Sequence, residues 1–327
     1  MAGYIIRRIG IMIPTLIVIS IISFTVIQLP PGDYLSSYVA QLRQQGENVD
    51  DIELANLRER YGLGLPVYQQ YFKWITGIIL RGDWGQSLEW QKPVKDLIWE
   101  RMGITVILSL AALFVSWFVA IPLGVFSATH QYSIPDYLVT LFSFIGVGTP
   151  GFLLALIIMW FAMSQLGLNV GGLFSNEYID APWSWAKFVD MLKHLWIPVL
   201  ILALNSTAGG LRTTRANLLD ELNKPYVETA RAKGIKESKL IWKYPVRVAL
   251  NPFFSTVGWE LANLISGATL ISVVLSLQTT GPLMLRALTS QDMYLAGSFL
   301  LLLSSLTVIG TLISDILLAW VDPRIRL

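Results

Sequence analysis

The 327-residue sequence contains no cysteine and only two histidines, His130 and His194, which lie far apart in the chain. Without cysteine the chain cannot form a disulfide framework, supply a thiolate nucleophile or hold a metal through sulfur. The GxxxxGKS/T phosphate loop, the HExxH zinc motif and the GxSxG nucleophile motif are absent as well. These absences leave no catalytic residue and no metal ligand to assign, and we expect no enzyme activity in this chain.

Charged residues are scarce: they make up 14% of the chain, against about 25% in soluble domains. Hydrophobic residues make up 54%, and the mean hydropathy is +0.57. The net charge of +2 at pH 7 is too small to indicate binding to nucleic acid. This composition is typical of a polytopic membrane protein.

Six hydrophobic runs predict membrane spans, most of them long enough to cross a hydrocarbon core about 30 Å thick. The third run is interrupted by Gly146, Gly148, Pro150 and Gly151. Two interpretations are open for these residues: close helix packing through small side chains, or a flexible element that lines a pathway. The predicted spans are residues 9–29, 104–128, 137–166, 195–211, 253–277 and 296–320.

The longest polar region, residues 30–101, lies between the first two predicted spans. Helical spacing predicts a helix at 50–61. Residues 66–79 predict an amphipathic helix rich in aromatic side chains, which would lie in the membrane interface or pack within a small subdomain. We therefore divide the chain into an N-terminus with the first span (1–29), an external loop region (30–101) and a core of five further spans (102–327).

The distribution of lysine and arginine predicts the orientation of these spans. Six spans place both termini on one side, together with the turn at 129–136 and the loop at about 212–252. That side holds 13 of the 24 lysines and arginines in about 60 residues, and the longer opposite side holds the rest. The positive-inside tendency then places both termini and the 212–252 loop in the cytoplasm.

The stretch 226–252, YVETARAKGIKESKLIWKYPVRVALNP, is basic and rich in helix formers, with Gly234 near its middle. Glycine is unfavourable inside a helix by roughly 1 kcal/mol, so the pattern predicts a helix, a tight turn at Gly234 and a second helix. A polar hairpin between membrane spans must protrude into water. It could contact a partner, or it could be a solvated connecting loop.

Glu228, Thr229 and Ala230, followed by Gly234, resemble the EAA loop of permease subunits of ABC importers, which docks on the ATP-hydrolysing subunit. The string YVETARAKG is similar to the dipeptide/oligopeptide branch of this family. Thr229 replaces the usual middle alanine, and Lys243-Tyr244-Pro245 stands where a histidine-containing segment is common. Further matching landmarks, spread over the whole chain, are Tyr4 to Arg8, Pro31-Gly32-Asp33, Arg60 to Leu63, Gly82-Asp83, Ser87 and Asp322 to Arg326.

This resemblance implies an all-α polytopic membrane protein with six transmembrane helices of the type I ABC importer kind and an external helical loop region. The chain would be the permease subunit with a long outer loop after its first span, in a prokaryotic cytoplasmic membrane. It would pair with a second homologous permease subunit, two ATP-binding subunits and an extracytoplasmic solute-binding protein. ATP and Mg would be held by the ATP-binding subunits, with no cofactor in this chain. The residues implied in coupling are Tyr226, Glu228, Ala230, Arg231 and Gly234.

The substrate is less defined. Peptide permeases of this branch usually carry an acidic residue in the fifth span and a Phe-x-x-Pro-Gly turn after it, whereas the matching positions here are Ser272, Leu275, Gln278 and Thr279. Relatives also carry short oligosaccharides, and this departure makes us favour an oligosaccharide slightly over an oligopeptide.

Glu260 is an intramembrane acid, and such residues are functional candidates by default. We name Glu260 and Ser272 as possible pathway residues; a buried structural acid is the alternative for Glu260. An ion-coupled secondary transporter using Glu260 is the rival function. It is disfavoured because transporters of that class usually show an internal repeat, and none is found in this sequence.

Overall fold

The computed structural model describes residues 2–28, 65–87, 89–167, 171–179 and 181–321. The predicted helix at 50–61 and the landmarks at 31–33, 60–63 and 322–326 lie outside these residues. The described part is helical and contains no strand beyond an isolated bridge between Gln86 and Pro93. The predicted all-α fold class is therefore confirmed.

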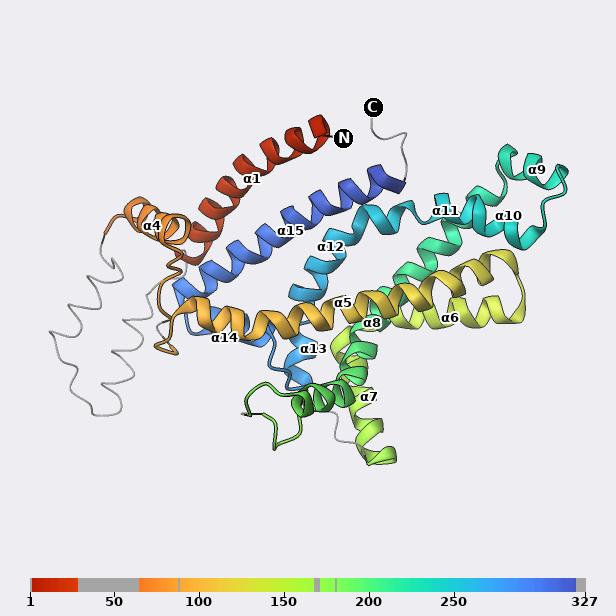
Figure 1. The fold of residues 1–327 in the computed structure, drawn as a ribbon. Coiled ribbons are helices and arrows are strands. Elements are labelled where there is room, and N and C mark those ends of the chain that lie inside the picture. Colours follow the sequence, from red (N-terminus) through yellow and green to blue (C-terminus); the bar gives the residue numbers. More distant parts are fainter. Residues whose placement is uncertain (1, 29–64, 88, 168–170, 180, 322–327) are drawn as a thin grey trace. The chain divides into compact units, whose positions relative to one another are not determined.

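Figure 1 shows the order of the helices along the chain, and a π-helical turn, η1, directly follows α4. The elements are α1 (Ala2–Gln28), α4 (Val67–Thr76), η1 (Gly77–Arg81), α5 (Val94–Thr129), α6 (Ile134–Gly148), α7 (Gly151–Leu166), α8 (Trp185–Leu222), α9 (Pro225–Ala232), α10 (Glu237–Lys243), α11 (Pro245–Ala249), α12 (Asn251–Gly267), α13 (Thr269–Val274), α14 (Thr280–Thr289) and α15 (Met293–Val321).

Among the described residues, five helices or helix pairs are long and apolar enough to cross a membrane: α1, α5, α8, α12 with α13, and α15. The α6–α7 pair is bent by 109° at a short break between the two helices. It makes a sixth span if the pair is counted as one broken helix. The break falls at Thr149 and Pro150, within the interruption seen in the sequence. The predicted set of hydrophobic segments is thus confirmed.

The predicted fourth span, residues 195–211, lies within a longer helix, because α8 extends well beyond both ends of the hydrophobic run. Its N-terminus is capped by Ser184, whose hydroxyl accepts a hydrogen bond from the Lys187 N–H at 3.2 Å. Two charged residues near the start of α8 have partners in the preceding loop. Lys187 Nζ donates to the carbonyl of Ala181 at 2.6 Å, and Asp190 accepts from the Ser175 hydroxyl at 2.6 Å.

The chain divides into two compact units, which we describe separately. Unit 1 comprises the described residues of 104–281 and 309–321, and unit 2 comprises the described residues of 2–103 and 282–308. The first boundary lies close to the predicted start of the core at residue 102. The segment Pro282–Val308 belongs to the same unit as the N-terminal part of the chain. The predicted division used contiguous stretches of sequence and therefore placed this segment in the core.

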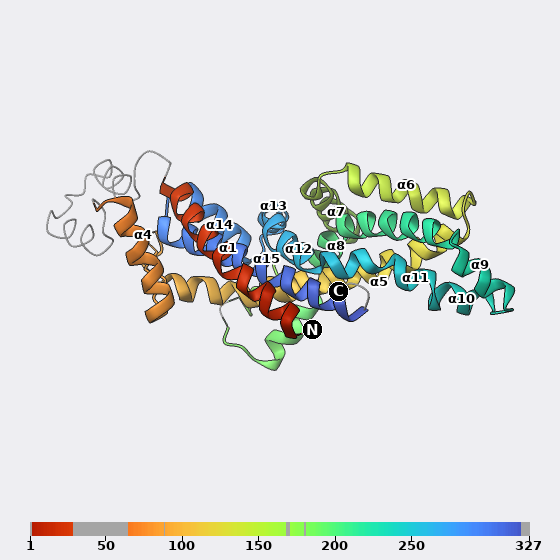
Figure 2. The same ribbon diagram turned by 90° about the horizontal axis from the view of Figure 1, so that it is seen from above.

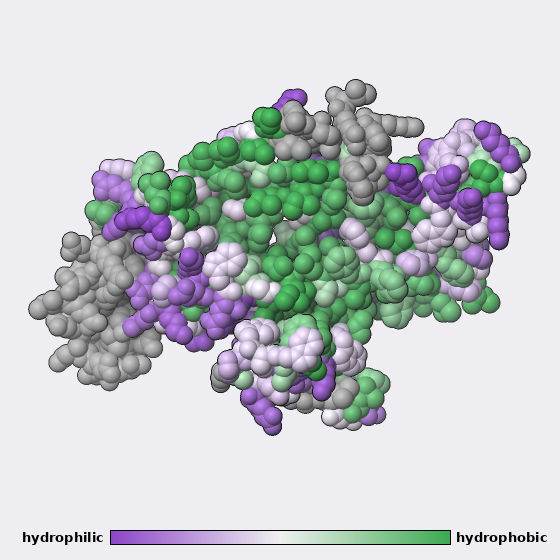
Figure 3. All heavy atoms as spheres, viewed as in Figure 1, coloured by the Kyte–Doolittle hydropathy of each residue, from purple (hydrophilic) through white to green (hydrophobic). Residues whose placement is uncertain are grey.

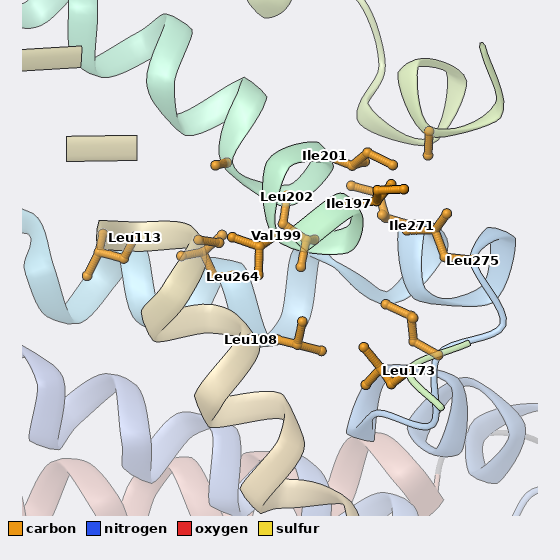
Figure 4. Close-up of a cluster of buried hydrophobic side chains, with 14 of the residues drawn as sticks. Leu108, Leu113, Leu173, Ile197, Val199, Ile201, Leu202, Leu264, Ile271 and Leu275 are labelled. Atoms are coloured by element: carbon orange, nitrogen blue, oxygen red, sulfur yellow. The ribbon is translucent and has the colours of Figure 1, made fainter. Parts of the chain in front are cut away.

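Unit 1 has one main hydrophobic cluster, built by α5, α7, α8, α12 and α13 (Figure 4). Leu108, Ile201 and Leu275 are at most 2% exposed and point into it. Leu173 enters the cluster from the loop before α8. Branched aliphatic side chains dominate the cluster, so dispersion contacts between helices hold this part of the fold.

Small residues allow close helix contacts in unit 1. A Cβ on Gly146 would lie 2.8 Å from the Cβ of Ala208, so α6 packs tightly along α8, as both ribbon views show (Figures 1 and 2). A Cβ on Gly151 would lie 3.0 Å from the side chains of Asn205 and Ile271, whereas one on Gly148 would meet nothing within 4 Å. Gly146 and Gly151 therefore fit the close-packing interpretation.

Unit 2 holds the predicted aromatic helix, now α4 followed by η1. Its Trp74 packs with Phe24 of α1 and Leu301 of α15, and Tyr71 Oη lies 2.8 Å from the Ser20 hydroxyl. Asp292, which is fully buried, accepts from the Ser87 hydroxyl at 2.5 Å and from the Leu295 N–H at 3.2 Å. This carboxylate caps the start of α15 and fixes the segment around Ser87 to it.

Candidate functional site

The stretch predicted as a hairpin folds as one. Its two helices, α9 and α10, are separated by a turn in which Gly234 has φ +73°. Pro225 occupies the first turn of α9, where its missing N–H costs nothing, and Glu228 lies in the same turn, where its charge complements the helix dipole. The helix–turn–helix prediction and the role of Gly234 as its turn residue are confirmed.

The hairpin has a small hydrophobic interior of its own. Val227 and Leu240 are fully buried and Ala230 is 7% exposed; Ile235 and Tyr244 pack around them. The Ala230 methyl group thus lies between α9 and α10 and is not available to a partner. Of the five residues implied in coupling, Ala230 is the one that packs inside the hairpin.

The outer surface of the hairpin carries the other four. Glu228, Arg231 and Gly234 are exposed, and Tyr226 is 39% exposed. Arg231 Nη2 donates to Glu237 Oε1 at 2.6 Å, which ties α9 to α10 across the turn. Hydrophilic side chains gather over these two helices in Figure 3. The structure therefore brings the predicted coupling residues together on one water-facing protrusion.

Three groups on this surface have shifted pKa values: those of Arg231 and Tyr226 are raised and that of Glu237 is lowered. The Arg231 guanidinium holds the pKa of the Glu237 carboxyl below its usual range, so the ion pair persists at neutral pH. Partial burial, together with a hydrogen bond to Glu221 at 2.5 Å, raises the pKa of Tyr226. The Tyr226 hydroxyl therefore remains a donor, and it fastens the start of α9 to the end of α8.

The base of the hairpin is packed onto the long helices of unit 1. Val246 and Ala249 of α11 bury against Val125 of α5 and Leu218 of α8. All four side chains are at most 6% exposed. A force applied to α9 and α10 would therefore reach α5 and α8 through tight hydrophobic contacts, without passing through a loose loop.

A buried ion pair lies near the same end of α8. Arg215 donates through Nε and Nη2 to the two carboxylate oxygens of Asp136, both at 3.0 Å. The Ser127 hydroxyl also donates to Asp136, and the Tyr132 N–H donates to it at 3.0 Å. Asp136 is 2% exposed. These contacts hold α5, the α5–α6 turn, α6 and α8 together.

The second candidate site is a cavity of about 450 Å³ within unit 1. One face of α8 contributes Asn205, Ser206, Gly209, Gly210 and Thr213, and one face of α12 contributes Phe253, Thr256, Glu260 and Asn263. Ser116 and Trp117 of α5 complete the polar and aromatic lining. This arrangement forms a pocket with many polar groups between helices, and such pockets can bind small molecules.

The two predicted pathway residues are placed differently. Glu260 lines this cavity. Ser272 is 2% exposed in α13 and is not among the lining residues. The polar face of α8 was not recognised from sequence, although its spacing of i, i+1, i+4, i+5 and i+8 gives a helical face. It falls partly outside the short span predicted there.

Comparisons with known proteins place this fold. The protein-family model described as "Binding-protein-dependent transport system inner membrane component" matches residues 120–327. A second, described as "Binding-prot-dependent transport system membrane comp, N-term", matches residues 1–111.

Curated relatives match along the whole chain. The oligopeptide transport system permease protein AppB of Bacillus subtilis is 36% identical over 100% of both chains. The dipeptide transport system permease protein DppB of Alkalihalophilus pseudofirmus is 30% identical over 100% of both. The peptidoglycan transport system permease protein YejB of Agrobacterium fabrum is 29% identical over 99% of this chain and 98% of its own.

The chain therefore belongs to the family of inner membrane components of binding-protein-dependent transport systems. It is a multi-pass membrane permease subunit of an ABC importer, as the family resemblance implied. Members of this family are transport subunits and are not themselves catalytic. Nothing in these matches supports the rival interpretation as an ion-coupled secondary transporter.

Proposed function

We propose that this chain is one half of the membrane channel of a peptide importer. It would assemble with a second homologous permease subunit, two ATP-binding subunits that hold ATP and Mg, and an extracytoplasmic solute-binding protein. The two termini and the α9–α10 hairpin would face the cytoplasm of a prokaryotic cell. The clustering of lysine and arginine on that side of the chain supports this orientation.

The observation that carries the proposal is the shape and seating of the hairpin. It presents Glu228 and Arg231 to water, is braced internally by Val227, Ala230 and Leu240, and is packed at its base onto α5 and α8. A solvated connecting loop requires none of this internal packing. A rigid polar element joined to membrane helices can instead carry the motion of an ATP-binding subunit into the membrane.

In this mechanism ATP binding draws the two ATP-binding subunits together and displaces the hairpin seated on one of them. The displacement passes through the α11 contacts to α5 and α8, and α8 lines the polar cavity. The Asp136–Arg215 pair makes α6 move with α8. The cavity is thereby exposed alternately to the two sides of the membrane.

For the substrate, we favour a peptide. The relatives named above are named for oligopeptide, dipeptide and peptidoglycan transport. The preference for an oligosaccharide, which rested on the departures at Ser272, Leu275, Gln278 and Thr279, gains no comparable support. The peptidoglycan relative keeps open a substrate that contains both peptide and sugar.

Uptake by the complete transporter in proteoliposomes tests the proposal. We expect an equimolar mixture of alanine peptides of two to six residues to accumulate when ATP is supplied on the hairpin side and solute-binding protein on the other. Maltooligosaccharides of the same lengths should not accumulate, and ADP or this chain alone should give no uptake. Accumulation of the saccharides instead of the peptides would contradict the substrate class. Proton-driven uptake by this chain alone would contradict the whole proposal.

A further inference from the structure

The polar cavity of unit 1 has an uneven charge. Among the residues that the structure describes, its lining contains one carboxyl group, that of Glu260, and no lysine, arginine or histidine. The other polar side chains in it are neutral: Ser116, Asn205, Ser206, Thr213, Thr256 and Asn263. Two nearby cations on α8 are engaged elsewhere, since Arg215 pairs with Asp136 and Arg212 stacks on Phe144 at 5.1 Å. The Glu260 carboxyl is therefore the one acidic group that the described lining presents, with no basic group beside it.

Within the described part of the chain, the Glu260 carboxylate has neither a hydrogen bond nor an ion pair. The alternative interpretation of Glu260 is a buried structural acid that has a partner, and no such partner is found among the described residues. A charged group in a membrane protein is costly unless it is paired or hydrated. The cavity around Glu260 leaves room for a ligand that supplies the missing cation.

The rest of the lining restricts that ligand. Asn205 and Asn263 each offer an amide that can both donate and accept hydrogen bonds, as a peptide backbone requires. Trp117 and Phe253 lie edge to face with centroids 5.6 Å apart, and aromatic rings attract ammonium groups. A single carboxylate would repel the carboxyl end of a peptide and attract its amino end. A neutral sugar would leave the charge uncompensated.

We propose that Glu260 binds the amino-terminal ammonium group of a peptide as it passes through this cavity, with Asn205 and Asn263 hydrogen-bonded to the adjacent backbone. This inference rests on the proposed function and adds to it a residue that recognises the substrate. It also gives the peptide an orientation, with the amino end held at α12.

The first test compares uptake of the alanine peptide mixture by complete transporters that carry Glu260→Gln or Trp259→Phe. Trp259 is the matched control: it neighbours Glu260 on α12, is 61% exposed and does not line the cavity. Glu260→Gln removes a hydrogen bond between two charged groups. We expect this to lower kcat/KM by about tenfold or more. The control should stay within about twofold of wild type, a small effect typical of surface positions.

The outcomes separate this inference from the proposed function. If wild type takes up no peptide of the mixture, the proposed function fails and this inference fails with it. If wild type and Glu260→Gln take up the peptides equally, the proposed function stands and only the role of Glu260 is overturned.

A second measurement uses the wild-type protein and so does not depend on how the variant assembles. A membrane-permeant carbodiimide joins a carboxylate to an amine in direct contact with it, forming an amide and a urea. We expect mass spectrometry to find Glu260 joined to tri-alanine and not to N-acetyl-tri-alanine. Absence of the amide with the free-amino peptide would overturn the proposal.

Discussion

Gly258→Ala is expected to lower the thermal unfolding midpoint and the folded yield of the purified chain sharply. A Cβ on Gly258 would overlap the backbone of Gly310, so α12 and this part of α15 would have to separate. The Gly258 N–H also donates to the Ser314 hydroxyl at 2.8 Å, and the separation would break this bond. Overpacking typically costs 1–3 kcal/mol, and rigid backbone atoms on both sides place this case at about 3 kcal/mol.

Gly148→Ala is the matched control for that prediction. Gly148 is also helical, but a Cβ there would meet nothing within 4 Å. We expect this variant to unfold at the wild-type temperature or slightly above it, because alanine is the better helix former. Equal midpoints for Gly258→Ala and Gly148→Ala would show that the α12–α15 contact is not as close as described.

Asp136→Ala is expected to have a comparable or larger effect on stability. It removes both carboxylate acceptors of the Arg215 guanidinium, leaving only the Ser127 hydroxyl as acceptor, and leaves the arginine partly buried without its counter-charge. Breaking a buried pair by removing one partner costs about 3–5 kcal/mol. The double variant Asp136→Ala with Arg215→Met should recover part of this loss, since no uncompensated charge remains.

Thermal unfolding in detergent measures the Asp136 effect, with Asp220→Ala as the control. Asp220 is an exposed acid on α8, so its loss should change the midpoint little. If Asp136→Ala and Asp220→Ala unfold at the same temperature, the ion pair does not hold α6 to α8. In that case, α6 would have no such link to the motion proposed for α8.

The sequence predicted the membrane segments well because hydrophobicity over about twenty residues is a local property. Even the interruption of the third span was visible, since glycine and proline mark it directly. The start of α8 was not predicted, because the residues there resemble those of a loop. Lys187 and Asp190 look like residues outside a span, and their contacts to the preceding loop are not visible in the local sequence.

The hairpin was predictable in its helices and its turn, because helix formers and Gly234 encode them locally. The burial of Ala230 depends on Leu240 folding back over α9, which a residue pattern in α9 alone does not reveal. The cavity was missed because it exists only where faces of α5, α8 and α12 meet. The same holds for the Asp136–Arg215 pair, which joins residues from helices far apart in sequence.

Site-specific cross-linking of the hairpin tests the central claim most directly, and this chain has no native cysteine that would compete for the label. A benzophenone maleimide attached at Glu228→Cys in the complete transporter should cross-link to an ATP-binding subunit on illumination. The control is Gln131→Cys, an exposed position in the α5–α6 turn on the same expected side of the membrane, which should give no such product. If position 228 gives no cross-link in a transporter that still imports peptides with ATP, or if both positions cross-link equally, the hairpin is not the docking element.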